Sequence, residues 1–180
     1  MKALILAGAV MAAAGGAAYA QHQHGGGMNA MPTPQGLSDG PYLEAMTMHH
    51  RDGIRMAELA ADRTNNAQVR DLATNLVVVQ QGELKELEHL AGTAGMQHAG
   101  MTKDRGASAK GTPIDDLSDA SGTVFDRKFL DLMIKHYQKA VRMSRDADLK
   151  NTDLRQFARR SLEDQQNRTK EMQQLRKQIR

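Results

Sequence analysis

The sequence has no cysteine and no tryptophan, and aromatic residues make up only 3% of its 180 residues. Without cysteine the chain can form no disulfide, no thiolate metal site and no cysteine nucleophile. A site for a soft metal must therefore use methionine thioether and histidine imidazole, and the chain contains 12 methionines and 7 histidines. The alternative is that methionine fills the core volume that aromatic rings fill in other proteins.

The sequence also has only one long apolar run, at its start. Residues 1–20 combine Lys2, an apolar stretch and the small-residue ending Ala18-Tyr19-Ala20. This pattern is typical of a secretory signal peptide, and the apolar part is too short for a stable membrane span. We therefore expect cleavage near Ala20 and a mature protein without a membrane span. The expected location is a bacterial periplasm, with secretion as the alternative.

Charge of one sign does not dominate any stretch. The formal net charge is +3, and basic residues alternate with acidic ones along helical stretches such as residues 142–150. This alternation indicates a solvated surface. The sequence shows neither a basic stripe nor basic residues interleaved with aromatic ones, and export also argues against nucleic acid, so we predict no nucleic-acid partner.

Two parts of the chain resemble each other. The segment YLEAMTMHHRDGIRMAELA, from Tyr42, aligns without gaps with FLDLMIKHYQKAVRMSRDA, from Phe129. A second block, VRDLATNLVVVQQGELKELEHL from Val69, aligns with LRQFARRSLEDQQNRTKEMQQL from Leu154. An internal repeat of this length indicates a duplicated structural unit, here a pair of helices in each half.

The duplication predicts an all-α protein, a four-helix bundle made of two helical hairpins. Helix-start and helix-end signals place the helices at about residues 41–63, 66–91, 123–148 and 151–180, with Gly92 closing the second. The predicted organisation is a signal peptide (1–20), a flexible arm containing Met and His (21–40) and a duplicated domain (41–180), in which two hairpins (41–91 and 123–180) are joined by a flexible crossover (92–122). The alternative is a homo-oligomer in which each hairpin pairs with a copy.

Histidines lie on the apolar stripe of both first helices. At 100° per residue, His49 and His50 fall on the same face as Met46 and Met56. The equivalent face of the second repeat carries a histidine and a tyrosine. Buried polar groups need partners, so we predict a connected polar interior, made of His49, His50, His136, Tyr137, Gln80 and Gln165, with an ion pair between Glu83 and Arg168.

These residues suggest a site for a soft metal ion. Thioether sulfur together with imidazole nitrogen suits Cu(I) or Ag(I). The candidate ligands are His49, His50, His136, Met46, Met56, Met133 and Met143. The alternative is that each histidine is a hydrogen-bonded core residue. Met48 falls on the opposite face of its helix and is predicted to be exposed.

Methionine and histidine also occur in the segments predicted to be flexible. Weaker candidate ligands are His22, His24, Met28 and Met31 in the arm and Met96, His98 and Met101 in the crossover. Flexible Met/His strings on an exported protein fit loose capture of copper. The alternative is a low-complexity linker without a metal role.

One motif resembles a known family. The pattern M-x-x-H-H followed by I-x-M-A, at Met46, His49, His50, Ile54, Met56 and Ala57, resembles the signature of the domain of unknown function 305 family, and QQGELKELEHL is similar to that family's second-helix pattern. The resemblance covers about residues 40 to 180, in both repeats. It implies a ferritin-like four-helix bundle, export in bacteria and, for some members, copper binding or copper resistance. The family's histidine motif falls on His49 and His50, and on His136 in the second repeat, where Tyr137 replaces the second histidine. This departure favours one composite site over two symmetric ones.

Three hypotheses follow. The first is an exported protein that captures or buffers copper without turnover, so that its partner is a metal ion and it is not an enzyme. The second is a structural or interaction protein whose hydrogen-bonded His/Gln core sets the helix register without metal. The third is a di-iron enzyme, which needs about four carboxylates and two Glu-x-x-His pairs. Only Glu86 and His89 make such a pair, and they lie toward the flank of their helix.

Overall fold

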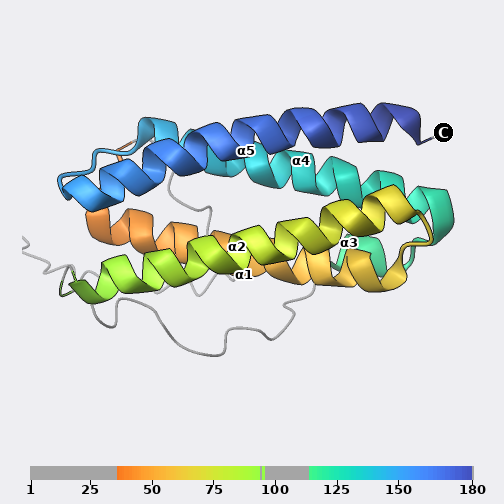
Figure 1. Ribbon diagram of the computed structural model, residues 1–180, viewed down its shortest axis with the longest axis horizontal. Coiled ribbons are helices and arrows are strands. Elements are labelled where there is room, and N and C mark those ends of the chain that lie inside the picture. Colours follow the sequence, from red (N-terminus) through yellow and green to blue (C-terminus); the bar gives the residue numbers. More distant parts are fainter. Residues whose placement is uncertain (1–35, 94, 96–113, 180) are drawn as a thin grey trace, which may run out of the picture. The chain divides into compact units, whose positions relative to one another are not determined.

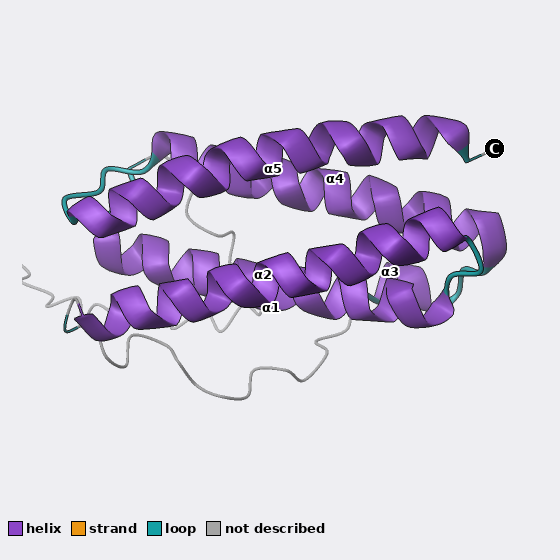
Figure 2. Ribbon diagram, viewed as in Figure 1, coloured by secondary structure: helices purple, strands orange, loops and turns teal. Residues whose placement is uncertain are grey.

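The computed structural model describes residues 36–93, 95 and 114–179, and every regular element in these residues is an α-helix (Figure 2). The predicted signal peptide (1–20), residues 21–35 of the arm and residues 96–113 of the crossover lie outside the described residues. In chain order the helices are α1 (Asp39–Arg63), α2 (Ala67–Thr93), α3 (Asp115–Ser118), α4 (Gly122–Asp146) and α5 (Thr152–Gln178).

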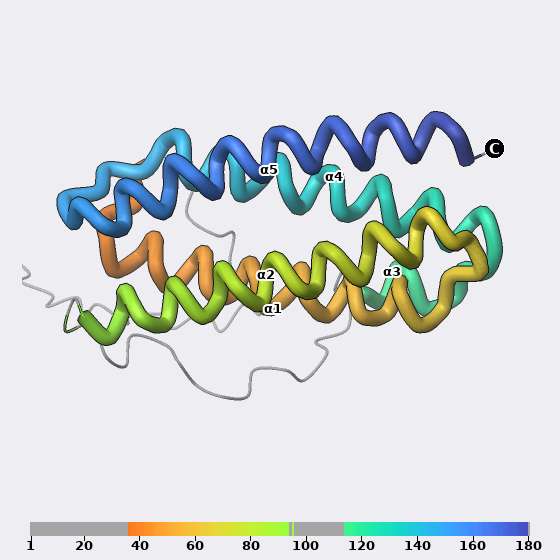
Figure 3. The backbone as a smooth tube through the Cα atoms, viewed as in Figure 1, coloured from red at the N-terminus to blue at the C-terminus, as the bar shows by residue number. Residues whose placement is uncertain are grey.

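The four long helices form two hairpins. α1 packs most extensively against α2, and α4 against α5, while α1 also contacts α4 and α2 contacts α5. Within each hairpin the two helices run antiparallel (Figure 1, Figure 3). The arrangement confirms the prediction of an all-α bundle built from two helical hairpins. None of the helices in the described part of the chain has the length and apolar character that a membrane span requires.

Equivalent asparagines begin the second helix of each hairpin. The side-chain oxygen of Asn66 accepts hydrogen bonds from the backbone N–H groups of Gln68 and Val69, at 3.0 and 3.3 Å. The side-chain oxygen of Asn151 accepts one from the backbone N–H of Leu154, at 2.9 Å. These bonds satisfy N–H groups that a helix start leaves without partners, and each such cap stabilises a helix by about 1 kcal/mol. The repeat therefore includes the signals that turn the chain between helices.

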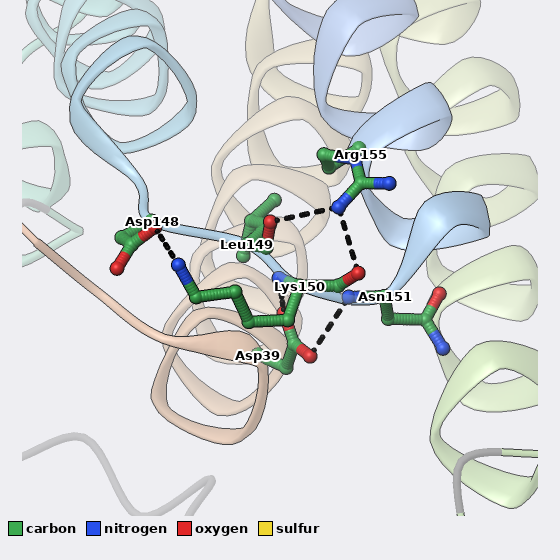
Figure 4. A network of polar contacts seen from close by, with 6 residues as sticks. All are labelled: Asp39, Asp148, Leu149, Lys150, Asn151 and Arg155. Carbon is green, nitrogen blue, oxygen red and sulfur yellow. Dashed lines mark hydrogen bonds and ion pairs between the residues drawn. The ribbon is translucent and has the colours of Figure 1, made fainter.

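Two equivalent aspartates join the hairpins at their ends. Asp39, at the start of α1, accepts hydrogen bonds from the backbone N–H groups of Lys150 and Asn151, at 2.8 and 3.0 Å, in the turn between α4 and α5 (Figure 4). Asp126, near the start of α4, accepts one from the hydroxyl of Thr64, at 2.5 Å, in the turn between α1 and α2. Each hairpin therefore holds the turn of the other through the same position of the repeat. These contacts fix the height of one hairpin relative to the other.

The end of the arm and the end of the crossover belong to the fold, which corrects the prediction that both segments are flexible throughout. Leu37 is buried, and its carbonyl accepts a hydrogen bond from the N–H of Asp148, at 3.0 Å. In the crossover, α3 buries Leu117 completely. Arg63, near the end of α1, donates hydrogen bonds to backbone carbonyls around the end of α3. Composition alone indicates linkers here, but one buried leucine anchors each segment to the core.

The second long helix ends later than predicted. α2 continues through Gly92 to Thr93, and the glycine with a left-handed backbone is Gly95, at φ +66°. A helix commonly ends where a glycine takes this conformation, so Gly95 and not Gly92 marks the end. α4 is shorter than predicted and ends at Asp146.

The core consists of two apolar clusters with polar residues between them. One cluster contains Met46 and Met143, and the other contains Met56 and Met133. Along α1, α2 and α5, polar or small residues separate the two clusters, and on α4 His136 lies beside Tyr137, the last residue of the cluster of Met56 and Met133 on that helix. We call these residues the central polar layer: His49, His50 and Gly53 on α1, Gln80 on α2, His136 on α4, and Ser161 and Gln165 on α5.

Candidate metal centre

The side chains of the central polar layer are removed from water. His50 is 1% exposed, Gln80 2%, and His49 and Gln165 4% each. His136 is partly buried as a residue, but its Nε2 atom is fully buried. A polar group in such a place costs free energy unless it has a partner, so the partners of each group show what the layer can do.

His49 and His136 form a stacked pair across the interface between α1 and α4. Their ring centroids are 3.6 Å apart, and the ring planes differ by 6°. Neither ring takes part in a side-chain hydrogen bond within the described residues, and the buried Nε2 of His136 has no partner. The lone pair of an imidazole nitrogen lies in the ring plane. Stacked rings therefore direct their lone pairs side by side, and one ion can bind both rings only after one ring turns.

Both stacked histidines are neutral at neutral pH. Burial lowers the pKa of His136 from 6.5 to about 3, with a further lowering by the nearby charges of His50 and Lys139. Burial also holds the pKa of His49 well below its usual value, and charge on His136 and His50 adds to the effect. Neutral imidazole is the form that binds metal ions. The burial of the pair therefore keeps it in a ligand-competent state.

His50 differs from its neighbours because both of its ring nitrogens are occupied. Nδ1 lies 2.8 Å from the backbone oxygen of Met46, and Nε2 lies 2.9 Å from a carboxylate oxygen of Glu83. A carbonyl can only accept, so Nδ1 is the donor in the first contact. In the second contact, the nitrogen and the carboxyl share one proton. His50 therefore fits the alternative of a hydrogen-bonded core residue better than that of a metal ligand.

The predicted ion pair between Glu83 and Arg168 is wrong. Glu83 bonds to His50 of its own hairpin, and Arg168 donates from Nη1 to the side-chain oxygen of Asn75 at 2.8 Å. The two residues occupy equivalent positions in the repeats, on α2 and α5. Each therefore bonds to a different residue, and among the described residues the buried Nε of Arg168 has no hydrogen-bond partner.

Gly53 makes room for two side chains of the central polar layer, a role that was not predicted from the sequence. A Cβ built on Gly53 would lie 2.7 Å from His136 Nε2 and 2.8 Å from Gln80 Cδ, and closer still to Gln80 Oε1. Real Cβ atoms essentially never approach other atoms within 3.0 Å. The glycine therefore lets His136 and Gln80 reach the backbone of α1. A glycine inside a helix costs about 1 kcal/mol relative to alanine. A glycine on the buried stripe, one turn after the histidines, was therefore the sequence feature that could have indicated a close approach of other side chains.

Four buried side-chain atoms in and beside the layer lack hydrogen-bond partners within the described residues. They are Gln80 Nε2, His136 Nε2, Gln165 Oε1 and Arg168 Nε. Such atoms are rare in folded proteins, and each one calls for an explanation such as a bound ion or water. The other end of one of these amides is bonded, because Gln165 Nε2 donates a hydrogen bond to the hydroxyl of Ser161, at 2.7 Å.

The four predicted methionine ligands are all buried, but they do not converge as one group. Met46 and Met133 are 0% exposed, Met56 2% and Met143 3%. Because two belong to each apolar cluster, methionine lies on both sides of the central polar layer. Met48 is 40% exposed, as predicted. Met172, which was not among the predicted ligands, is fully buried in the cluster of Met56 and Met133.

The residues considered for a di-iron centre face away from the core. Glu86 bonds to Arg160 on the surface, and His89 is exposed. In the described residues, no group of three or more His, Asp or Glu side chains is placed to hold a metal ion. The weaker candidates in the arm and the crossover, His22, His24, Met28, Met31, Met96, His98 and Met101, lie outside the described residues.

Comparison with known proteins places the chain in a family. The model of the family "Domain of unknown function (DUF305)" matches residues 8–91 and 39–176. The chain belongs to the DUF305 family. A curated relative, the uncharacterized protein L153 of Acanthamoeba polyphaga mimivirus, is 31% identical over 61 residues, which cover 34% of this chain and 40% of the viral protein. The chain therefore matches less than half of that relative.

Solved structures of the same fold include a copper-bound protein. CopM in its Cu(II)-bound form is 27% identical, with a TM-score of 0.66 over 79% of this chain and 99% of CopM. The Ag-bound form of CopM gives 27% identity and a TM-score of 0.64, over 78% and 96%. A DUF305 fragment from Deinococcus radiodurans is 23% identical, with a TM-score of 0.67 over 82% of this chain and 97% of the fragment. The last likeness shows the fold alone.

Proposed function

We propose that this DUF305 protein is an exported copper-binding protein that captures Cu(I), and also Ag(I), through the imidazoles of His49 and His136 and thioether sulfurs of the neighbouring methionines. The observation that carries the proposal is the stacked pair itself. It presents two neutral imidazoles that are committed to no side-chain hydrogen bond within the described residues. Since buried polar groups nearly always have partners, such a pair is costly unless it serves a ligand.

The donor chemistry of the layer fits a soft, monovalent ion. Neutral imidazole and thioether carry no charge, and both favour Cu(I) over hard cations. The carboxylate of Glu83 already bonds to His50. A divalent ion would bring two positive charges to a pair of neutral, buried imidazoles, and the cost of burying charge is high. The likeness to CopM, which has been solved with Cu(I) and with Ag, supports a soft monovalent ion, and CopM has also been solved with Cu(II).

Binding requires a local rearrangement of the stacked pair. One ring turns so that its lone pair meets that of the other ring at the ion, and methionine supplies further ligands. Methionine suits this role because its three rotatable bonds let the sulfur follow the ion. Met46 and Met143 lie on one side of the layer and Met56 and Met133 on the other, so either cluster can contribute.

An anaerobic Cu(I) titration against a chromophoric competing chelator tests the proposal. The wild-type chain from Gln21 is expected to compete for Cu(I), and the variants His49→Ala and His136→Ala are expected to lose that competition. His89→Ala is the matched control, because His89 is exposed on α2. Equal binding by all four proteins would contradict the assignment of ligands to the bundle.

The same titration separates the bundle from the arm. A chain beginning at Gly36 lacks His22, His24, Met28 and Met31 but keeps the central polar layer. Retained tight binding supports the ligands in the bundle, and lost binding transfers the role to the arm. Export through residues 1–20 is part of the proposal, and fractionation of expressing cells for the processed chain beginning at Gln21 checks it.

A second candidate function is supported by the bonds of His50. Its contacts to Met46 and Glu83 are those of a polar core residue that sets helix register, as in a structural or interaction protein without metal. This reading predicts that His49→Ala and His136→Ala change stability or self-association while the wild type binds no Cu(I). Analytical ultracentrifugation beside the titration distinguishes the two.

A further inference from the structure

Gln80 and His136 meet over the bare backbone of Gly53. The amide of Gln80 comes from α2, and the ring of His136 comes from α4. The point where a Gly53 Cβ would lie is 2.7 Å from His136 Nε2 and 2.8 Å from Gln80 Cδ. Two groups that are this close to one point are neighbours, and the amide oxygen of Gln80 is the nearest atom of all to that point. An acceptor oxygen therefore lies beside a ring nitrogen that has no hydrogen-bond partner in the part of the chain that the structure describes.

We infer that Gln80 is the positioning residue of the metal site: its side-chain oxygen accepts the Nε2–H of His136 and leaves Nδ1 as the nitrogen that binds the ion. This inference rests on the proposed function. A rotation of the Gln80 amide about its side-chain bonds would bring its oxygen toward the Nε2–H. Metal-binding histidines almost always donate their second ring N–H to a carbonyl, a carboxylate or water, which fixes the tautomer and the ring orientation.

The space around His136 supports this choice of nitrogen. Nε2 of His136 has the amide of Gln80 and the backbone of Gly53 beside it, so an N–H on this nitrogen has an acceptor close by. The two ring nitrogens point in diverging directions, so Nδ1 points away from whatever Nε2 contacts. His136 can therefore bind an ion through Nδ1 while Gln80 holds Nε2.

The amide nitrogen of Gln80 has a complementary group on the other hairpin. Within the described residues, Gln80 Nε2 is a donor without a partner, and Gln165 Oε1 is an acceptor without one. The contacts from Arg168 to Asn75 and from Arg160 to Glu86 bracket these two glutamines along α2 and α5, so the glutamines lie at the same level. One chain of bonds, from His136 to Gln80 to Gln165, would satisfy three of the orphaned atoms and connect α4, α2 and α5.

Nitrogen-15 NMR of the imidazole groups of the metal-free protein at pH 7 tests the inference directly. The wild type is expected to show His136 in the Nε2–H tautomer. Gln80→Met keeps the length of the side chain but removes the acceptor, so the Nε2–H tautomer is expected to lose its dominance. Gln81→Ala, an exposed glutamine on the same helix, is the control and is expected to leave the spectrum of His136 unchanged. A tautomer that is identical in the wild type and Gln80→Met, or an Nδ1–H tautomer in the wild type, would overturn the inference.

Cu(I) affinity gives the second readout. Loss of such a supporting hydrogen bond weakens metal binding by about 10- to 100-fold. The Cu(I) affinity of Gln80→Met is therefore expected to fall by this factor, and that of Gln81→Ala is expected to equal that of the wild type. Should Gln80→Met fail to fold, Gln80→Glu keeps an oxygen in place, and loss of the Nε2–H tautomer in that variant also overturns the inference. A wild type that binds no Cu(I) overturns the proposed function, whereas normal binding with an unaffected tautomer in Gln80→Met overturns the role of Gln80 alone.

Discussion

Replacing Gly53 by alanine should destabilise the bundle, although the same change elsewhere in a helix stabilises it. In a helix interior, alanine is favoured over glycine by about 1 kcal/mol. At Gly53 the new Cβ would lie 2.7 Å from His136 Nε2 and nearer to Gln80 Oε1, so both side chains must move within a packed core. Such overpacking costs about 1–3 kcal/mol. The net change in the free energy of unfolding is therefore a loss of up to about 2 kcal/mol.

Gly82 provides a matched control for this prediction. It lies inside α2, it is exposed, and a Cβ built on it meets nothing within 4 Å. Gly82→Ala is expected to gain about 1 kcal/mol. Because the propensity gain is common to both variants, the difference between them isolates the steric cost at Gly53, about 1–3 kcal/mol. Urea unfolding followed by circular dichroism measures both.

Two results would contradict a steric role for Gly53. A Gly53→Ala variant as stable as Gly82→Ala would show that the layer has room for the methyl group. The double variant Gly53→Ala with Gln80→Ala removes the closest clash, so its stability is expected to exceed the sum of the two single effects. Strict additivity would mean that Gln80 does not occupy the space beside Gly53. In the Cu(I) titration, Gly53→Ala should also weaken binding, because it displaces His136.

Three further predictions concern charge and hydrogen bonding. Lowering the pH from 7 to 5 should destabilise the fold, since His136 has a folded-state pKa of about 3 against 6.5 in the unfolded chain. Below pH 6.5 the unfolded state binds more protons, so the free energy of unfolding falls by up to about 1.4 kcal/mol per pH unit. Urea unfolding at several pH values should show that this free energy depends less steeply on pH in His136→Leu. Glu83→Ala should cost about 1–3 kcal/mol, because His50 loses its carboxylate partner in a buried site; thermal denaturation would show this loss, and an unchanged melting temperature would contradict it. Asp39→Ala should cost about 1–2 kcal/mol through two lost hydrogen bonds to the turn of the other hairpin, with Asp126→Ala as the equivalent change at the opposite end and chemical denaturation as the measurement.

The helices and their pairing could be predicted from sequence because periodicity, caps and the internal repeat all point the same way. Asn66 and Asn151 stand at helix starts, and the repeat itself requires two similar hairpins. The burial of Met46 and Met133 follows from the same 3.6-residue period. What failed was composition-based reasoning about linkers, because a single apolar residue such as Leu117 can anchor a segment that is otherwise rich in small residues.

The contacts inside the polar layer could not be predicted, because they depend on helix rotation and relative height. A rotation of a helix about its own axis by tens of degrees decides whether Glu83 contacts His50 or Arg168. The sequence does not determine this rotation. The stacking of His49 on His136 also requires the heights of α1 and α4, which are set by Asp39 and Asp126 through bonds to distant turns. Gly53 was visible in the sequence, but its purpose is clear only once the side chains that fill its place are known.

The duplication built two equivalent halves, and their later divergence explains why one site is expected and not two. In the first repeat, His50 pairs with Glu83. The equivalent position holds Tyr137, whose pKa is raised by burial, with the charge of Arg168 acting against that rise. A neutral phenol offers no soft ligand, and a fixed guanidinium charge beside it disfavours a cation by Coulomb repulsion. The half that contains Arg168 is therefore unsuited to a metal ion of its own, whereas the proposed pair of His49 and His136 would supply one ligand from each repeat. A composite site of this kind would use both halves of the duplication and would need only one histidine in the second repeat.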